Sequence, residues 1–173
     1  PPPAPPPPLT RADPAQDRLK NSTASIKDDY DYILIDCPPA LNMLPLNALV
    51  ASDGVIIPLQ CEYYALEGLT ALMDTIDQVR SSVNPELQIE GLLRTMYDRR
   101  NTLANDVSAQ LVKHFGDRVY RTIVPRNVRL AEAPSYGLPV MVYDKTSRGA
   151  LAYLALAGEM LRRETRNRAQ ASA

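Results

Sequence analysis

Short apolar runs alternate with longer stretches of helical period from residue 30 to residue 163. The continuous runs are typical of strands buried on both faces of a sheet, and they cover residues 32–36, 54–59, 89–97, 119–124 and 139–143. Between them, apolar side chains recur every three or four positions over 44–52, 66–83, 103–115 and 147–163. Strands separated by helices predict right-handed crossovers and a mostly parallel, doubly wound α/β sheet.

Element ends are marked by residues that break or cap regular structure. Pro38 and Pro39 close the first strand, Asn84-Pro85 ends the helix over 66–83, and Gly116 ends the helix over 103–115. Ser147 is a good N-cap for the last helix. Seven of the 16 prolines lie in the first eight residues. We therefore predict a proline-rich disordered lead over 1–25, one folded domain over 26–165 and a disordered tail over 166–173.

Composition narrows the class of protein. A chain of 173 residues, 45% hydrophobic, can bury the core of one domain. Cys37 and Cys61 are too few for a disulfide scaffold and lack metal-site spacing. The sequence contains no apolar run of about 18 residues, the length that a membrane-spanning helix needs. The charge is uneven: residues 1–90 carry 5 Lys/Arg against 13 Asp/Glu, whereas residues 91–173 carry 14 against 7, which permits an anionic partner for the second half.

Polar residues follow each predicted strand, where parallel sheets bind their ligands. They are Asp36, Gln60–Glu62, Tyr97-Asp98 and Pro125–Asn127, and we expect them to line one edge of the sheet. The run Ile33–Asp36 also has the form of a Walker B strand, whose carboxylate holds Mg²⁺, or one of its waters, beside nucleotide phosphates. Taken singly, each of these residues is more simply interpreted as an ordinary turn residue, and many parallel strands end in aspartate.

The segments 30–69, 90–107 and 119–161 closely resemble the ParA/Soj-type chromosome (plasmid) partitioning ATPases of the deviant-Walker P-loop class. The most specific stretches are QCEYYALEGL (60–69) and IVPRNVRLAEAPSYG (123–137). The resemblance implies a P-loop NTPase fold that uses ATP and Mg²⁺. It also implies ATP-dependent homodimerisation, nonspecific binding of double-stranded DNA and hydrolysis stimulated by a ParB-type partner protein.

The chain departs from this family in lacking its phosphate-binding loop. None of its seven glycines is followed by lysine, and no GxxxxGK[ST] motif occurs. We therefore expect an incomplete P-loop fold, without the N-terminal P-loop strand and helix, that does not hydrolyse ATP or bind it productively by itself. A truncated product, a fragment of a longer or split protein, and a degenerate paralogue remain open, so enzymatic activity is left undecided. The alternative function is a non-enzymatic DNA- or partner-binding module.

The resemblance assigns roles to particular residues. Asp36 corresponds to the Walker B aspartate that orders the magnesium shell through water. Pro125, Arg126 and Asn127 match the loop that approaches the nucleotide in this family. Arg100 and Arg129 match the arginines that are implicated in DNA binding, and Arg99 adds a charge next to Arg100.

The last twelve residues, RRETRNRAQASA, contain no large apolar side chain. They therefore do not form the amphipathic membrane-targeting helix of MinD-type relatives. We expect a cytoplasmic, nucleoid-associated protein without a membrane partner.

Overall fold

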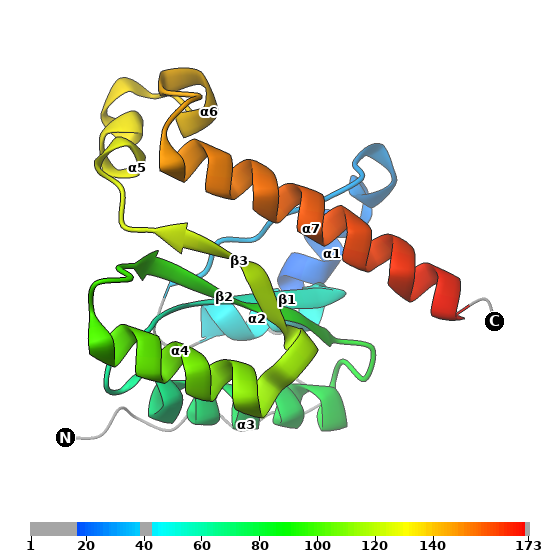
Figure 1. The fold of residues 1–173 in the computed structure, drawn as a ribbon. Helices are drawn as coiled ribbons and strands as arrows, with labels where there is room; N and C mark the ends of the chain where they lie inside the picture. The colour runs from blue at the N-terminus through cyan, green and yellow to red at the C-terminus, as the bar shows by residue number, and fades with distance from the viewer. Residues whose placement is uncertain (1–16, 39–42, 172–173) are drawn as a thin grey trace. The chain divides into compact units, whose positions relative to one another are not determined.

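The computed structural model describes residues 17–38 and 43–171, and the chain divides into two compact units. Unit 1 consists of the residues up to Val55 together with Gly68–Glu90, and unit 2 consists of Ile56–Glu67 together with the residues from Gly91 onward. Three parallel strands form a sheet in the order β1 (Gly54–Gln60), β2 (Gln88–Tyr97), β3 (Val119–Pro125) (Figure 1). The predicted parallel α/β sheet is confirmed.

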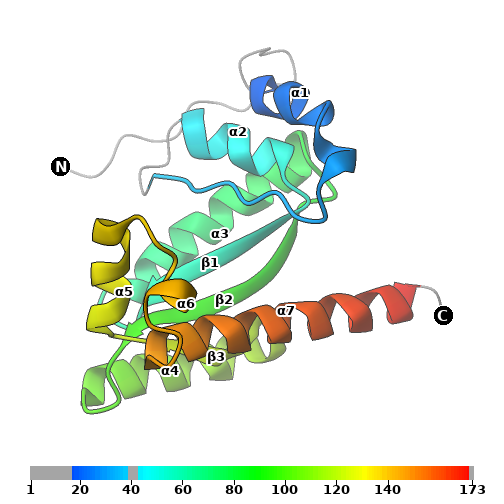
Figure 2. The ribbon, with the colours of Figure 1, turned by 90° about the horizontal axis from the view of Figure 1, so that it is seen from above.

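Unit 1 is built mainly from helices. α1 (Arg18–Ala24), which precedes the 3-10 helix η1 (Lys27–Asp29), lies beside α2 (Met43–Ala51) (Figure 2). α3 (Ala65–Ser82) supplies most of its length to this unit. Asn84 Nδ2 donates to the carbonyl oxygens of Leu49 and Ser52, each at 2.9 Å, and so pairs groups that the end of α2 leaves open. The buried apolar side chains of this unit include Leu46, Leu49, Val50, Leu69, Ile76, Val79 and Leu87.

The predicted strand over residues 32–36 is wrong. This segment forms neither helix nor strand, and Tyr32, Ile33 and Leu34 expose 52%, 39% and 82% of their surface. An apolar run becomes a strand only where a neighbouring strand pairs with its backbone N–H and C=O groups. No strand of the described residues pairs with this run.

In unit 2, α4 (Thr102–Phe115) and α7 (Arg148–Ala171) cover opposite faces of β2 and β3 (Figure 1). On the α7 face, Leu93, Tyr120, Val124 and Leu156 form a buried apolar cluster. On the α4 face, the buried Arg94 donates to Ser108 Oγ at 2.8 Å and to the Tyr120 carbonyl oxygen at 2.8 Å. Successive residues of a strand point to opposite faces, so β2 places Leu93 against one helix and Arg94 against the other.

β3 is an edge strand of the described sheet, and two charged side chains of α7 cover its free side. The Glu159 carboxylate accepts hydrogen bonds from the backbone N–H groups of Arg121 and Thr122, both at 2.9 Å, and from Thr122 Oγ1 at 2.7 Å. Arg163, paired with Glu159 at 2.8 Å, donates to the Val119 carbonyl oxygen at 2.9 Å. These groups replace the hydrogen bonds that a further strand would make.

The pairing of β2 with β3 is irregular at the same place. Leu92 faces Val119 and Arg94 faces Ile123, so β3 contains two more residues than β2 between these pairs. This irregularity lets two successive amides of β3 reach Glu159. Burial alone would raise the pKa of Glu159, but the hydrogen bonds from β3 and Arg163 outweigh it and lower the pKa to about 2.

Two further sequence predictions need correction. Residues 139–143 do not form a strand, because the N–H groups of Val142 and Tyr143 bond to the Pro139 carbonyl oxygen and close the short helix α6 (Val140–Tyr143). α7 continues to Ala171, so residues 166–171 of the predicted tail are helical. Of the predicted lead, 18–24 form α1, and residues 1–16 lie outside the described part. The predicted N-cap is confirmed, since Ser147 Oγ accepts from the Ala150 N–H at 3.2 Å.

Candidate functional site

The carboxyl ends of β2 and β3 lie side by side. Tyr97 and Pro125 are partners across the two strands, and the Arg126 N–H donates to the Tyr97 carbonyl oxygen at 3.1 Å. Segments 97–101 and 125–129 therefore emerge together at one edge of the sheet. The prediction of a common edge is confirmed for these two strand ends.

The loop after β2 is fixed by its own side chains. Tyr97 Oη donates to Asn105 Oδ1 at 2.8 Å, and Asn105 Nδ2 donates to the Arg99 carbonyl oxygen at 3.0 Å. Asn101 caps α4 by accepting from the Ala104 N–H. Just before the loop, Met96 has a left-handed backbone conformation (φ 51°), which is unfavourable for residues other than glycine. The loop thus presents Arg99 and Arg100 from an ordered backbone.

Arg100 is held by Asp98 through three hydrogen bonds. Its backbone N–H and Nε donate to Asp98 Oδ1 at 3.0 Å each, and Nη2 donates to Oδ2 at 2.8 Å. These bonds are the main reason that the pKa of Asp98 falls to about 2, with the charge of Arg126 adding a smaller effect. The Arg100 side chain is 89% exposed, so its remaining nitrogen, Nη1, is available to a ligand.

The loop after β3 carries the residues assigned to the nucleotide. Pro125 ends the strand, Arg126 is exposed, and Asn127 caps the short helix α5 (Val128–Glu132) by accepting from the Arg129 N–H at 3.0 Å. Arg126 lies close enough to Asp98 to lower its pKa, which places this loop beside Arg100. The structure thus brings Arg100, Arg126 and Asn127 into one region.

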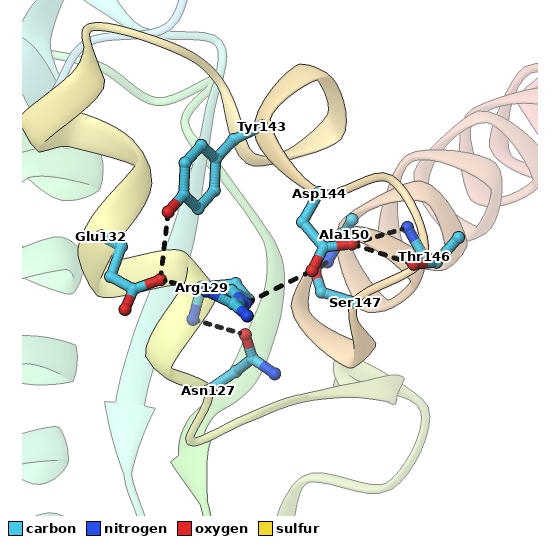
Figure 3. Close-up of polar contacts among 8 residues, drawn as sticks. All are labelled: Asn127, Arg129, Glu132, Tyr143, Asp144, Thr146, Ser147 and Ala150. Carbon is cyan, nitrogen blue, oxygen red and sulfur yellow. Dashed lines mark hydrogen bonds and ion pairs between the residues drawn. The ribbon is translucent and has the colours of Figure 1, made fainter.

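Arg129 is held by two carboxylates from different elements (Figure 3). Its Nη1 donates to Glu132 Oε2 at 2.7 Å, and its Nε lies 3.4 Å from Asp144 Oδ2, in the turn between α6 and α7. Glu132 Oε2 also accepts from Tyr143 Oη at 3.2 Å. These carboxylates raise the pKa of Arg129, Glu132 most strongly, and the side chain is 51% exposed.

The sequence analysis placed Asp98 at the sheet edge, but it did not predict that Asp98, Glu132 and Asp144 hold these arginines. Glu132 could have been found, because it lies three residues after Arg129 on the same helix. Asp98 could have been found because it lies only two residues before Arg100 in the loop after β2. Asp144 gives no such signal, since it is 15 positions from Arg129 and reaches it only through the turn after α6.

Asp36 lies in unit 1, on the exposed segment that replaces the predicted strand. Its neighbour Cys37 is exposed. The pKa of the Cys37 thiol is raised, mainly because the protein removes part of the water around the sulfur and to a smaller extent because of the negative charge of Asp36. In the described residues, no group of three or more His, Cys, Asp or Glu side chains is placed to hold a metal ion. A single carboxylate without a phosphate-binding loop does not by itself fit Mg²⁺-ATP, whose metal is shared with phosphates.

The chain is similar to a known domain family and to several curated proteins. The sequence profile described as "AAA domain" matches residues 7–89. The chain is 69% identical over 151 residues to a protein of Pseudomonas putida described as uncharacterized, covering 87% of this chain and 57% of that protein. It is 52% identical over 157 residues to the chromosome partitioning protein ParA of Caulobacter vibrioides, covering 90% and 59%. Identity to the sporulation initiation inhibitor protein Soj of Bacillus subtilis is 54% over 143 residues, covering 83% and 56%.

Among solved structures, the fold is similar to that of cobyrinic acid a,c-diamide synthase from Mycobacterium smegmatis with a bound ATP analog and magnesium. The TM-score is 0.71 at 34% identity, covering 91% of this chain and 57% of that one. The chain spans about 57% of the length of the curated relatives that it matches first. No described helix is at once long and apolar enough to cross a bilayer. The motifs, the fold and these relatives agree: the chain corresponds to part of a ParA/Soj-type chromosome-partitioning ATPase.

Proposed function

We propose that this chain carries the DNA-binding surface of a ParA-type partition ATPase. In the whole protein, this surface works with ATP-dependent homodimerisation and with hydrolysis stimulated by a ParB-type partner, on the nucleoid in the cytoplasm. The observation that carries the proposal is the shared strand edge, where Arg100, Arg126 and Arg129 follow two neighbouring parallel strands.

The charge of unit 2 supports this proposal. Unit 2 contains 14 Lys/Arg against 9 Asp/Glu. In the described residues, its arginines that are exposed and outside any ion pair are Arg99, Arg118, Arg121, Arg126, Arg148, Arg162 and Arg166. Guanidinium groups match phosphate oxygens, and such contacts give binding that is independent of sequence and sensitive to salt.

A second candidate function is a DNA- or partner-binding module without hydrolysis. It is favoured by the exposed position of Asp36 in the structure. Nucleotide contact by Pro125, Arg126 and Asn127, and magnesium ordering by Asp36, belong to the ATPase proposal.

The test is titration of fluorescent duplexes of unrelated sequence with the chain, over a range of salt concentrations. We expect a Kd near the weak end of about 10⁻⁴–10⁻⁶ M for every sequence. Arg100→Gln and Arg129→Gln should weaken binding equally on all duplexes and reduce the log–log salt slope by about one each.

Arg166→Gln is the matched control, because Arg166 is exposed on α7 and its substitution removes the same charge. The proposed surface is wrong if that control weakens binding as much as the two site variants do.

A further inference from the structure

The contacts of Arg129 restrict how it can bind phosphate. A guanidinium group offers two edges for a bidentate contact, Nε with Nη2 and Nη1 with Nη2. Asp144 lies at Nε and Glu132 at Nη1, so each edge has one of its two donors beside a carboxylate. A phosphate can therefore bind through two nitrogens only after one carboxylate gives way.

The two carboxylates are not held equally. Glu132 contacts Arg129 at 2.7 Å, lies three residues along the same helix, and is fixed by the Tyr143 hydroxyl. Asp144 lies farther away, at 3.4 Å, and comes from a different element. The edge formed by Nε and Nη2 is thus the easier one for a phosphate to take.

We propose that Asp144 sets the affinity of Arg129 for the DNA backbone: a phosphate takes the Nε edge of Arg129 in place of the Asp144 carboxylate. This inference rests on the proposed DNA-binding function and adds a residue that the sequence comparison does not assign. Asp144 is an affinity-determining residue that acts through Arg129 and does not touch the DNA itself.

The geometry of Asp144 provides a clean substitution. Its Oδ1 accepts from the Thr146 N–H at 3.2 Å and from Thr146 Oγ1 at 2.9 Å, whereas its Oδ2 faces Arg129 (Figure 3). Asp144→Asn keeps an acceptor for Thr146 and removes the negative charge beside Arg129. Asp144→Ser also keeps a turn-forming acceptor and provides a second variant if the first does not fold.

The experiment is a double-mutant cycle on DNA affinity, using a fluorescent duplex at low salt. We expect Asp144→Asn to tighten binding by about two- to fivefold, the range of a partly exposed ion pair. In the Arg129→Gln background the same change should give no gain. Glu164→Gln is the control, because Glu164 also pairs with an arginine on unit 2 and its loss changes the net charge equally.

The outcomes separate the inference from the proposed function. If Asp144→Asn tightens binding equally with and without Arg129, or no more than Glu164→Gln does, the effect is general charge and the inference fails. If Asp144→Asn leaves affinity unchanged while Arg129→Gln lowers it, the inference fails and the DNA-binding function stands. If Arg129→Gln has no effect on any duplex, the DNA role of Arg129 is itself wrong.

Discussion

Asp98 and Arg100, two residues apart, are joined by three hydrogen bonds, one from the backbone and two from the guanidinium group. At physiological pH the carboxylate and the guanidinium are both charged, so the pair carries no net charge, and the same hydrogen bonds lower the pKa of Asp98 to about 2. Asp98 therefore orders the Arg100 side chain and cancels part of its charge. These two effects act on DNA affinity in opposite directions.

Substitution of Asp98 will show which of these two effects on DNA affinity is larger. Asp98→Asn keeps an oxygen acceptor for the Arg100 N–H and removes the charge, so we expect DNA affinity at low salt to rise by about two- to fivefold. Fluorescence titration against the unmodified chain measures this change. Weaker binding by the variant would mean that Asp98 contributes chiefly by orienting Arg100.

Glu159 should make stability depend on pH in the acid range. Its pKa is about 2 in the folded chain, below its ordinary value of 4.5, so its contribution is complete above about pH 4.5 and is lost as pH falls toward 2. Glu159→Gln should lower the free energy of unfolding by about 1–3 kcal/mol at pH 7, because charged hydrogen bonds to β3 are lost. Urea denaturation should show this deficit shrinking between pH 4.5 and pH 3.

Glu164→Gln on the same helix is the control for Glu159. Glu164 pairs with the exposed Arg168, so its loss should change stability by no more than about 0.5 kcal/mol at either pH. A deficit of Glu159→Gln that stays constant down to pH 3 would contradict the role of the carboxylate charge.

Substitution by alanine at two glycines, Gly91 and Gly68, should change the stability of the fold in opposite directions. A Cβ at Gly91 would lie 2.5 Å from the Tyr120 ring and 2.9 Å from the Arg118 carbonyl oxygen, and Tyr120 is only 1% exposed. We expect Gly91→Ala to destabilise by about 1–3 kcal/mol through overpacking. Gly68→Ala, in α3 with no atom within 4 Å of the added carbon, should stabilise by about 0.5–1 kcal/mol. Equal thermal shifts for the two variants would refute this packing.

The chain alone should not hydrolyse ATP. Phosphoryl transfer needs an amide cradle and a lysine charge on the phosphates, and the sequence has no GxxxxGK[ST] motif to supply them. The measurement is magnesium-dependent phosphate release by the purified chain and by Asp36→Ala. Turnover above background that disappears in the Asp36 variant would show the expectation to be wrong.

The four long helices α2, α3, α4 and α7 and the three strands of the sheet were predictable, because their patterns are long and their ends are marked. α4 runs from an Asn101 cap to Gly116, whose left-handed backbone (φ 51°) ends it, and the sequence shows both signals. The failures were short apolar runs, for which strand and helix cannot be separated by period. Residues 139–143 close a helical turn on Pro139, and residues 32–36 have no partner strand among the described residues.

The candidate site was predictable only at the level of strand ends. Parallel strands place Tyr97 and Pro125 together, which a sequence pattern can foresee. The pairing of Arg129 with Asp144 depends on how the turn before α7 returns to α5, which a sequence pattern cannot give. The sequence assigned a DNA-binding role to Arg100 and Arg129 but did not predict the carboxylates that balance their charge in the structure.

The side chains that cover β3 also determine where the sheet can grow. Glu159 and Arg163 occupy the outward-facing amides and a carbonyl oxygen of β3, so an added strand would have to break a largely buried ion pair to bind there. In the described sheet, β1 lies at the opposite side of the strand order. Any strand that joins this sheet, from the same polypeptide or another, should therefore add next to β1 and lengthen the sheet in one direction only.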